Sequence, residues 1–319
     1  MTKLIALIVE DDTVFALPAW HRTIALLERR GLLVTHVAVI PPRIDQYGGV
    51  FRSLWYSSVF GLGNALRLGL FAEIEKRRRK QEPRTWEEMA HTHALVVRRF
   101  EDASSMEAEE FLRSSQCDVL HVLAPVTLSP VILDIPKTGV IAHHPSMLPS
   151  CRGMFPYFWA RLRGEPIGQS LHQVTPSEPA AAGPILAQQE ARPRVTGSML
   201  SFQIWAARRY PEMALDATQR LLVRRSLPGR SGLEASYCGL PTRRDRVQFE
   251  QLGGCVSKWS DLRLTVSSRK KETGAPEDAP ARTTTAYQFP EVLPLRVNSS
   301  PAPGKVIQMR PRQQAEPNS

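Results

Sequence analysis

The chain has 319 residues, of which 42% are hydrophobic and 23% are charged, and its formal net charge is +10 at pH 7. This composition is typical of a globular protein with a sizeable core, and it excludes a fibrous or wholly disordered chain. The positive charge raises nucleic-acid binding as a possibility. The basic residues are scattered, however, and no aromatic residues interleave with them. A solvated face or a site for phosphorylated small molecules explains them as well.

Four cysteines stand far apart in the sequence, and no two form a CxxC pair. This spacing predicts reduced thiols rather than a disulfide framework or a zinc site, which fits a cytoplasmic protein without a bound metal. The first residues, MTKLIALIVEDD, hold only a short apolar run before acidic residues. This start indicates a first strand and not a signal peptide.

The first predicted elements are a strand over residues 3–9 and a helix in LPAWHRTIALLERRG, where apolar residues recur at helical spacing up to Gly31. LLVTHVAVIPPR predicts a second strand, which two prolines end. Strand, helix and strand at this spacing indicate a βαβ unit and therefore a parallel sheet with a right-handed crossover.

A helical insert is expected over about residues 51–80. Serines, glycines and Arg67 interrupt its apolar stretch, so we expect no stable insertion into a membrane. The basic run at 76–80 leaves two interpretations open: an amphipathic helix on a membrane surface, or an insert that packs on its own domain.

Beyond the insert the alternation of helices and strands resumes, up to a strand that ends in GVIAHH. We therefore predict an α/β fold, with a Rossmann-like, mostly parallel sheet and helices on both faces, in a domain over residues 1–200. Residues 201–266 predict a C-terminal helix and a small mixed segment. Residues 267–319 are rich in proline, serine and charge, and they predict a disordered tail.

The stretch GVIAHHPSMLPSCRG, residues 139–153, places two adjacent histidines where a predicted strand ends. Ligands of open α/β sheets bind beyond the carboxyl ends of strands, so this position favours a functional site. The residues that form a recognisable pattern are His144, Pro145, Ser146, Leu148, Pro149, Arg152, Gly153, Gly168, His172, Gly183 and Pro184. In this order they resemble the core of the folate-dependent formyltransferases, which include glycinamide ribonucleotide, methionyl-tRNA and amino-sugar enzymes. The looser resemblance covers about residues 1–225.

The resemblance implies that 10-formyltetrahydrofolate is the co-substrate and that an amine attacks its formyl group. In the family, an asparagine amide and a histidine ring donate hydrogen bonds to the resulting oxyanion, and an aspartate orients the histidine. His144 occupies the histidine position. The folate pocket is implied to comprise the strand end with His121, Val122 and Leu123 and the loop from Thr175 to Ala182.

Two catalytic positions depart from the family's pattern. Ala142 stands where the asparagine is expected, and Ala181 stands where the aspartate is expected. The loss of one oxyanion donor lowers the rate by roughly 10²–10³, so most of the ordinary activity should be gone unless another group substitutes. Glu178 is one candidate, if its loop is shifted toward the site.

The two other histidines near the motif are weaker candidates. Alternate side chains of a strand point to opposite faces, so His143 is expected to face away from Ala142 and His144. His172 lies on the neighbouring strand, where it could reach the pocket or serve only as a structural residue.

The acceptor is expected to be a small amine. Residues 201–319 lack the alternating strands of the β-barrel that methionyl-tRNA enzymes add, so transfer to tRNA is not expected. The first loop, VEDDTVF, is acidic and lacks a phosphate-binding Gly-Ser cradle. Two hypotheses stand: an enzyme that formylates a small biosynthetic amine, or a catalytically impaired homologue that binds folate or another ligand as a regulator or partner. The oligomeric state is not indicated.

Overall fold

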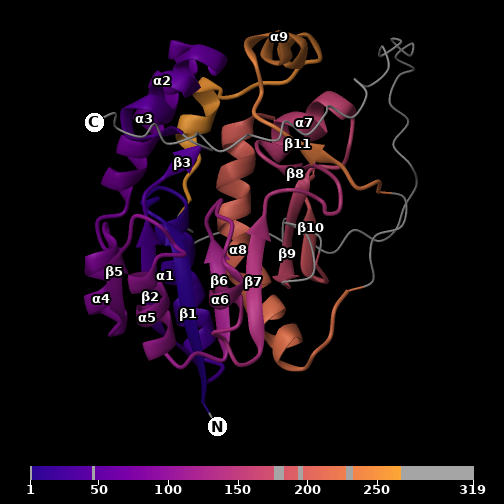
Figure 1. Ribbon diagram of the computed structural model, residues 1–319. Helices are drawn as coiled ribbons and strands as arrows, with labels where there is room; N and C mark the ends of the chain where they lie inside the picture. The colour runs from indigo at the N-terminus through magenta and orange to yellow at the C-terminus, as the bar shows by residue number, and fades with distance from the viewer. Residues whose placement is uncertain (1, 45–46, 176–182, 193–196, 228–232, 267–319) are drawn as a thin grey trace, which may run out of the picture. The chain divides into compact units, whose positions relative to one another are not determined.

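The computed structural model describes residues 2–44, 47–175, 183–192, 197–227 and 233–266 (Figure 1). The strands of the main sheet are β1 (Lys3–Glu10), β2 (Leu32–Ile40), β5 (Val96–Arg99), β6 (Val119–Leu123), β7 (Gly139–His144), β9 (Gly168–Val174) and β10 (Ile185–Glu190). Two separate pairs are β3 (Arg43–Ile44) with β4 (Tyr47–Gly48) and β8 (Arg152–Gly153) with β11 (Tyr237–Cys238). The helices are α1 (Ala16–Glu28), α2 (Gly49–Phe60), α3 (Leu62–Arg78), α4 (Trp86–His93), α5 (Met106–Ser114), α6 (Pro130–Leu133), α7 (Pro156–Arg163), α8 (Met199–Leu222), α9 (Arg243–Gln251) and the 3-10 helix η2 (Trp259–Arg263).

The order of the seven strands is β10-β9-β7-β6-β1-β2-β5. Strands β5, β2, β1, β6 and β7 run parallel, whereas β9 is antiparallel to both β7 and β10. The chain leaves β1 toward β2 and later returns to place β6 on the other side of β1. The switch point of the sheet therefore lies between β1 and β6, where open α/β sheets bind ligands at their carboxyl edge.

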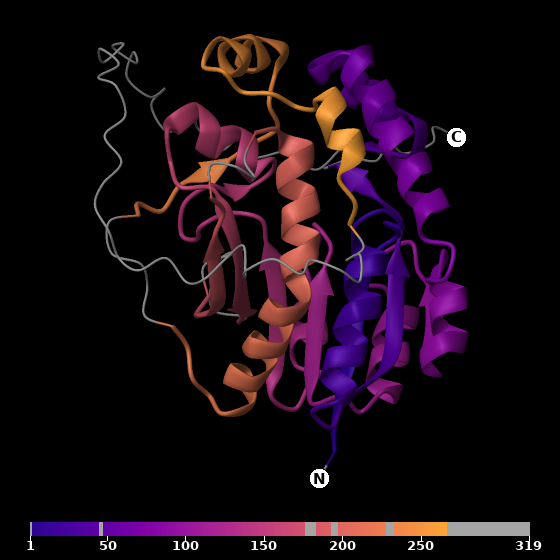
Figure 2. The same ribbon diagram turned by 180° about the vertical axis from the view of Figure 1, so that it is seen from behind.

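Period-two alternation in β1 explains why helices cover both faces of the sheet. Ile5, Leu7 and Val9 pack in one cluster with residues of α1 and α8, and Figure 2 shows these two helices on one face. Ala6 and Ile8 pack in a second cluster with residues of α5 and α6 on the other face. All five side chains are fully buried. The predicted fold class, a Rossmann-like and mostly parallel sheet with helices on both faces, is confirmed.

Helix α8 belongs to the same unit as the sheet. It begins at a capping box formed by Ser198 and Ser201, and its apolar side packs on α1, β9 and β10. One unit, Met1–Lys270, contains all the described residues. The predicted boundary between residues 200 and 201 therefore separates no two units, because α8 supplies part of the sheet's own core. The predicted tail, 267–319, lies outside the described residues.

The expected insert at 51–80 contains α2 and α3 and packs on the rest of its unit through the buried rings of Phe60 and Phe71. The carboxylate of Glu75 accepts hydrogen bonds from Thr265 and Val266, and Arg79 donates one to the carbonyl oxygen of Thr13. The Arg79 contact holds the insert against the loop after β1, and the Glu75 contacts hold it against residues 265–266. Within the described residues, no helix is long and apolar enough to span a membrane.

Candidate active site at the carboxyl edge of the sheet

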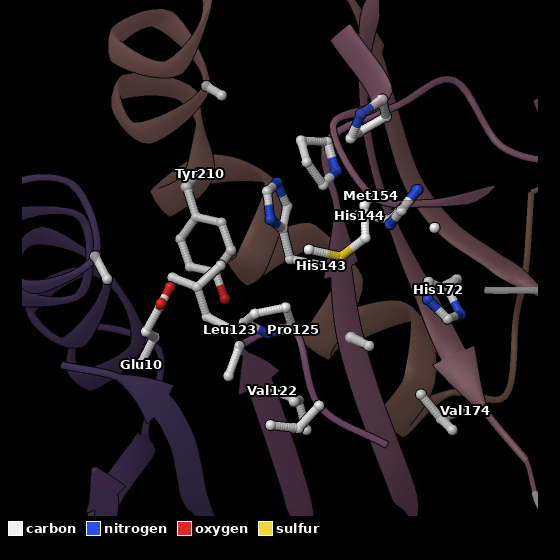
Figure 3. Close-up of a pocket in the computed structure, with 18 of the residues that line it drawn as sticks. Glu10, Val122, Leu123, Pro125, His143, His144, Met154, His172, Val174 and Tyr210 are labelled. Carbon is white, nitrogen blue, oxygen red and sulfur yellow. The ribbon is translucent and has the colours of Figure 1, made fainter. Parts of the chain in front are cut away.

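A pocket of about 720 Å³ opens at the carboxyl ends of β1, β6 and β7 (Figure 3). Strand β6 ends at Leu123, which pairs with Val9 of β1, so Glu10 extends one residue beyond it. Val122 pairs with Ala142 of β7, so His144 also extends one residue beyond the position opposite Leu123. The shorter central strand leaves a recess at the switch point, and its volume is that of a small-molecule site.

Ala142 and His144 lie on one face of β7, and both line the pocket. Ala142 pairs with His172 across β7 and β9, which brings a second histidine to the same wall. The alternation puts His143 on the other face, where its ring contacts Tyr210 of α8 at 5.4 Å between ring centroids. The opposite orientation expected for His143 is found, but its ring is not remote from the site, because α8 closes the same pocket.

The ring of His144 is held by one backbone contact. Its Nε2 lies 2.9 Å from the carbonyl oxygen of Cys151, and because a carbonyl oxygen can only accept, Nε2 carries the proton. Burial lowers the pKa of His144 below its ordinary value. The neutral ring therefore presents Nδ1 as a proton acceptor, and it becomes a second donor only when it is protonated.

Burial also keeps the neighbouring histidines neutral. It lowers the pKa of His143 to about 4, although Nε2 of that ring lies 2.9 Å from the side-chain oxygen of Gln169. It lowers the pKa of His172 to about 4 as well. At neutral pH the pocket therefore contains three uncharged imidazoles, so no histidine supplies a fixed positive charge to it.

The predicted folate-binding residues are only partly brought together. Val122, Leu123 and Thr175 line the pocket. His121 does not: its side chain is fully buried on the opposite face of β6, where Nε2 lies 2.8 Å from the hydroxyl of Thr218. The structure thus places the side chain of His121 away from the pocket lining, and its part in folate binding stays a prediction. Glu178, Ala181 and Ala182 lie outside the described residues.

Glu10 was missed as a site residue by sequence reasoning. Its side chain lines the pocket, and burial, with a further contribution from Asp12 and Asp11, raises its pKa to about 7. The guanidinium of Arg52 on α2 lies 3.9 Å away, and a backbone contact from Arg43 also favours the carboxylate. The acidic run after the first strand was the available signal, but it indicated only the lack of a phosphate cradle.

Asp12 has a different role from Glu10. Its carboxylate accepts hydrogen bonds from the backbone N–H groups of Val14, Phe15 and Ala16 at the start of α1, at 2.7, 3.0 and 3.3 Å. Helix N-termini bind anions through these free N–H groups and the helix dipole. Asp12 therefore occupies the place that an external phosphate group would take.

Tyr210 lies on the opposite wall from Glu10. Its side chain is 2% exposed, and its hydroxyl has no hydrogen-bond partner among the described residues. In Figure 3 the side chains of Tyr210 and Glu10 point toward one another near Leu123. A buried hydroxyl without a partner costs free energy in the absence of a ligand.

No group of three or more histidine, cysteine, aspartate or glutamate side chains in the described part of the chain is arranged to hold a metal ion. The described side chains that line the pocket include neutral imidazoles, the carboxyl groups of Glu10 and Asp12, and the buried phenol of Tyr210.

Parts of the chain are similar in sequence to known proteins. The chain is 35% identical over 97 residues to the methionyl-tRNA formyltransferase of Chlorobium limicola, covering 29% of this chain and 30% of the relative. It is 38% identical over 94 residues to the methionyl-tRNA formyltransferase of Deinococcus radiodurans, covering 28% and 29%. Over these stretches the chain is similar in sequence to methionyl-tRNA formyltransferases. The match spans about 30% of the length of these curated relatives, and no family model matches the chain.

A solved structure that resembles this chain is a sugar N-formyltransferase from a Shewanella species, with 15% sequence identity and a TM-score of 0.47, covering 78% of this chain and 87% of that one.

Proposed function

We propose that this protein transfers the formyl group of 10-formyltetrahydrofolate to the amine of a small biosynthetic substrate, and that His144 stabilises the oxyanion. The observation that carries the proposal is His144 in the lining of a pocket of about 720 Å³, on the carboxyl edge of the sheet. Val122, Leu123 and Thr175 supply largely apolar walls and backbone groups, which suit a flat heteroaromatic ring. The folate supplies the formyl group.

The tautomer of His144 determines that its ring accepts a proton before it donates a hydrogen bond to the oxyanion. Because Nε2 donates to Cys151, the neutral ring first accepts at Nδ1 the proton that the amine nitrogen must lose after it bonds to the formyl carbon. The ring is then a cation, and its Nδ1–H can donate to the negatively charged formyl oxygen. The proton finally passes to the folate nitrogen as the bond between that nitrogen and the formyl carbon breaks.

A second candidate function is binding without turnover, as a regulator or partner. Ala142 favours it, because a methyl group at this wall of the pocket cannot donate a hydrogen bond to an oxyanion. Folate binding that depends on backbone groups and apolar walls does not need the missing amide. Binding and transfer must therefore be measured separately.

The location of the folate site gives a first testable prediction. Ala142→Phe places a ring in the pocket, so it is expected to weaken the binding of a non-reactive 10-formyltetrahydrofolate analogue at least tenfold in titration calorimetry. Val131→Phe is the matched control, since Val131 is exposed on α6 and does not line the pocket. Equal affinities in both variants, or no binding by the unaltered protein, would contradict the proposed site.

Transfer itself is tested by formylation of a panel of small amines. Turnover by the unaltered protein that His144→Ala removes would support the enzyme. Tight binding of the analogue with no turnover on any amine would support the second candidate.

A further inference from the structure

The end of the pocket nearest β1 has a chemical character of its own. Glu10 comes from the end of β1, and Tyr210 comes from α8, which crosses the same end of the sheet. Both side chains line the pocket and point toward one another, yet no hydrogen bond joins them. A carboxyl group and an unpartnered phenol therefore face a common space.

This space suits a hydrogen-bond donor that carries a positive charge. A carboxylate only accepts, and the oxygen of a phenol can accept as well. A primary ammonium group has three N–H donors, so it can contact both oxygens at once. Charge-assisted hydrogen bonds of this kind are the stronger ones in a buried site.

An anion is disfavoured at the same place. The backbone N–H groups at the start of α1 are already bound by Asp12, so they are not free donors for a phosphate. The charges of Asp12 and Asp11 also raise the pKa of Glu10. Three guanidinium groups oppose these carboxylates: Arg52 lies 3.9 Å from Glu10, Arg99 pairs with Asp11, and Arg79 acts on Asp12. The pKa of Glu10 nevertheless stays raised, at about 7. At the start of α1 a phosphate group would therefore contact carboxylates, whereas at other helix N-termini it would find free backbone N–H donors.

The register places this end of the pocket at a useful distance from His144. Glu10 and His144 each extend one residue past the end of β6, on strands two positions apart in the sheet. Two strand spacings amount to roughly 10 Å. This gap can hold an amino group and a formyl group between the two side chains.

We propose that Glu10 and Tyr210 form the subsite that binds the acceptor through a protonated primary amino group, and that this subsite rejects a phosphate. The proposal rests on the formyl transfer proposed above and names the chemical class of its acceptor. The carboxylate of Glu10 takes one proton from the ammonium group, which leaves a neutral amine and a carboxylic acid. The amine then has the free electron pair that an attack on the formyl carbon requires.

The test measures ammonium binding without folate and without turnover. Titrations of n-butylammonium chloride, followed by saturation-transfer NMR at pH 8, are expected to show saturable binding to the unaltered protein. Glu10→Gln should weaken it roughly tenfold or more, which is the loss expected for a hydrogen bond to a charged group. Tyr210→Phe removes one neutral partner and should weaken it severalfold. Tetramethylammonium chloride, which has the charge but no N–H donor, should not compete.

Two controls accompany this test: one shows whether butylammonium binds at Glu10 and not elsewhere on the protein, and the other monitors the folate site. Glu107→Gln alters an exposed carboxylate on α5 and should leave butylammonium binding unchanged. The folate analogue should bind the unaltered protein and Glu107→Gln with the same affinity, so a failure of the folate site is seen independently. Sodium phosphate that displaces butylammonium, or undiminished binding by Glu10→Gln, would overturn the proposal.

Discussion

The double substitution Ala142→Asn with Ala181→Asp is expected to raise the rate of formyl transfer by roughly 10³-fold or more. One oxyanion donor is worth roughly 10²–10³ in rate, and the aspartate adds the orientation of His144. The two effects are not additive, because such residues act as a unit. Single-turnover formylation of the best amine of the panel, with the double variant beside the unaltered protein, measures the gain.

Volume alone must be excluded as the cause of this gain. Ala142→Leu with Ala181→Asp provides the control, since leucine has nearly the size of asparagine but no amide. If that variant is as fast as the asparagine variant, the restored amide is not an oxyanion donor. If neither is faster than the unaltered protein, the positions of Ala142 and Ala181 do not correspond to those of the family.

Glu10→Gln is expected to increase the free energy of unfolding by up to about 3 kcal/mol at pH 8 and to leave it unchanged at pH 4. Burial raises the pKa of Glu10 from 4.5 to about 7 in the folded protein, and each unit corresponds to about 1.4 kcal/mol. Below pH 4.5 the carboxyl group is protonated in both states, so there is no cost. As the pH rises from 4.5 to 7, only the unfolded chain ionises freely, and the stability of the unaltered protein falls.

Denaturant unfolding at several pH values tests this result, with Glu107→Gln as the exposed control. A stability difference that is the same at pH 4 and pH 8 would show that burial does not hold back the ionisation of Glu10. A destabilised Glu10→Gln would show that Arg52 and Arg43 contribute more than burial removes. If Glu10→Gln is more stable than the unaltered protein, as expected, its weaker binding of butylammonium cannot be explained by unfolding.

The sheet was predictable because it depends on short periodicities, whereas Ala142 and His144 were predicted from the resemblance to the formyltransferases, and their roles stay predictions. The alternation of side chains on a strand places Ala142 and His144 on one face, and the motif shows where the strand ends. The same rule, applied to β6, excludes His121 from the pocket. The sequence of the strand alone does not tell which of two adjacent residues faces the ligand, so His121 was predicted together with its neighbours.

Glu10 and Tyr210 could not have been found in this way. The role of Glu10 depends on its burial and on the length of β6 relative to β1, neither of which is visible in VEDDTVF. Tyr210 lies in a helix whose apolar spacing indicates ordinary core packing, and its unpartnered hydroxyl is a property of the folded chain. The part of the site around Glu178 and Ala181 remains a prediction from sequence.

The contacts of Glu75 fix how far the protein can be shortened for biochemical work. Val266 is the last residue before the predicted tail, and its N–H donates to the buried carboxylate of Glu75 on α3. Arg79, one turn further along the insert, donates to Thr13 beside the acidic loop. Removal of Thr265 and Val266 would strip a buried carboxylate of two donors next to Glu10's loop. A trimmed protein for ligand screening should therefore end after Val266 and not before Thr265.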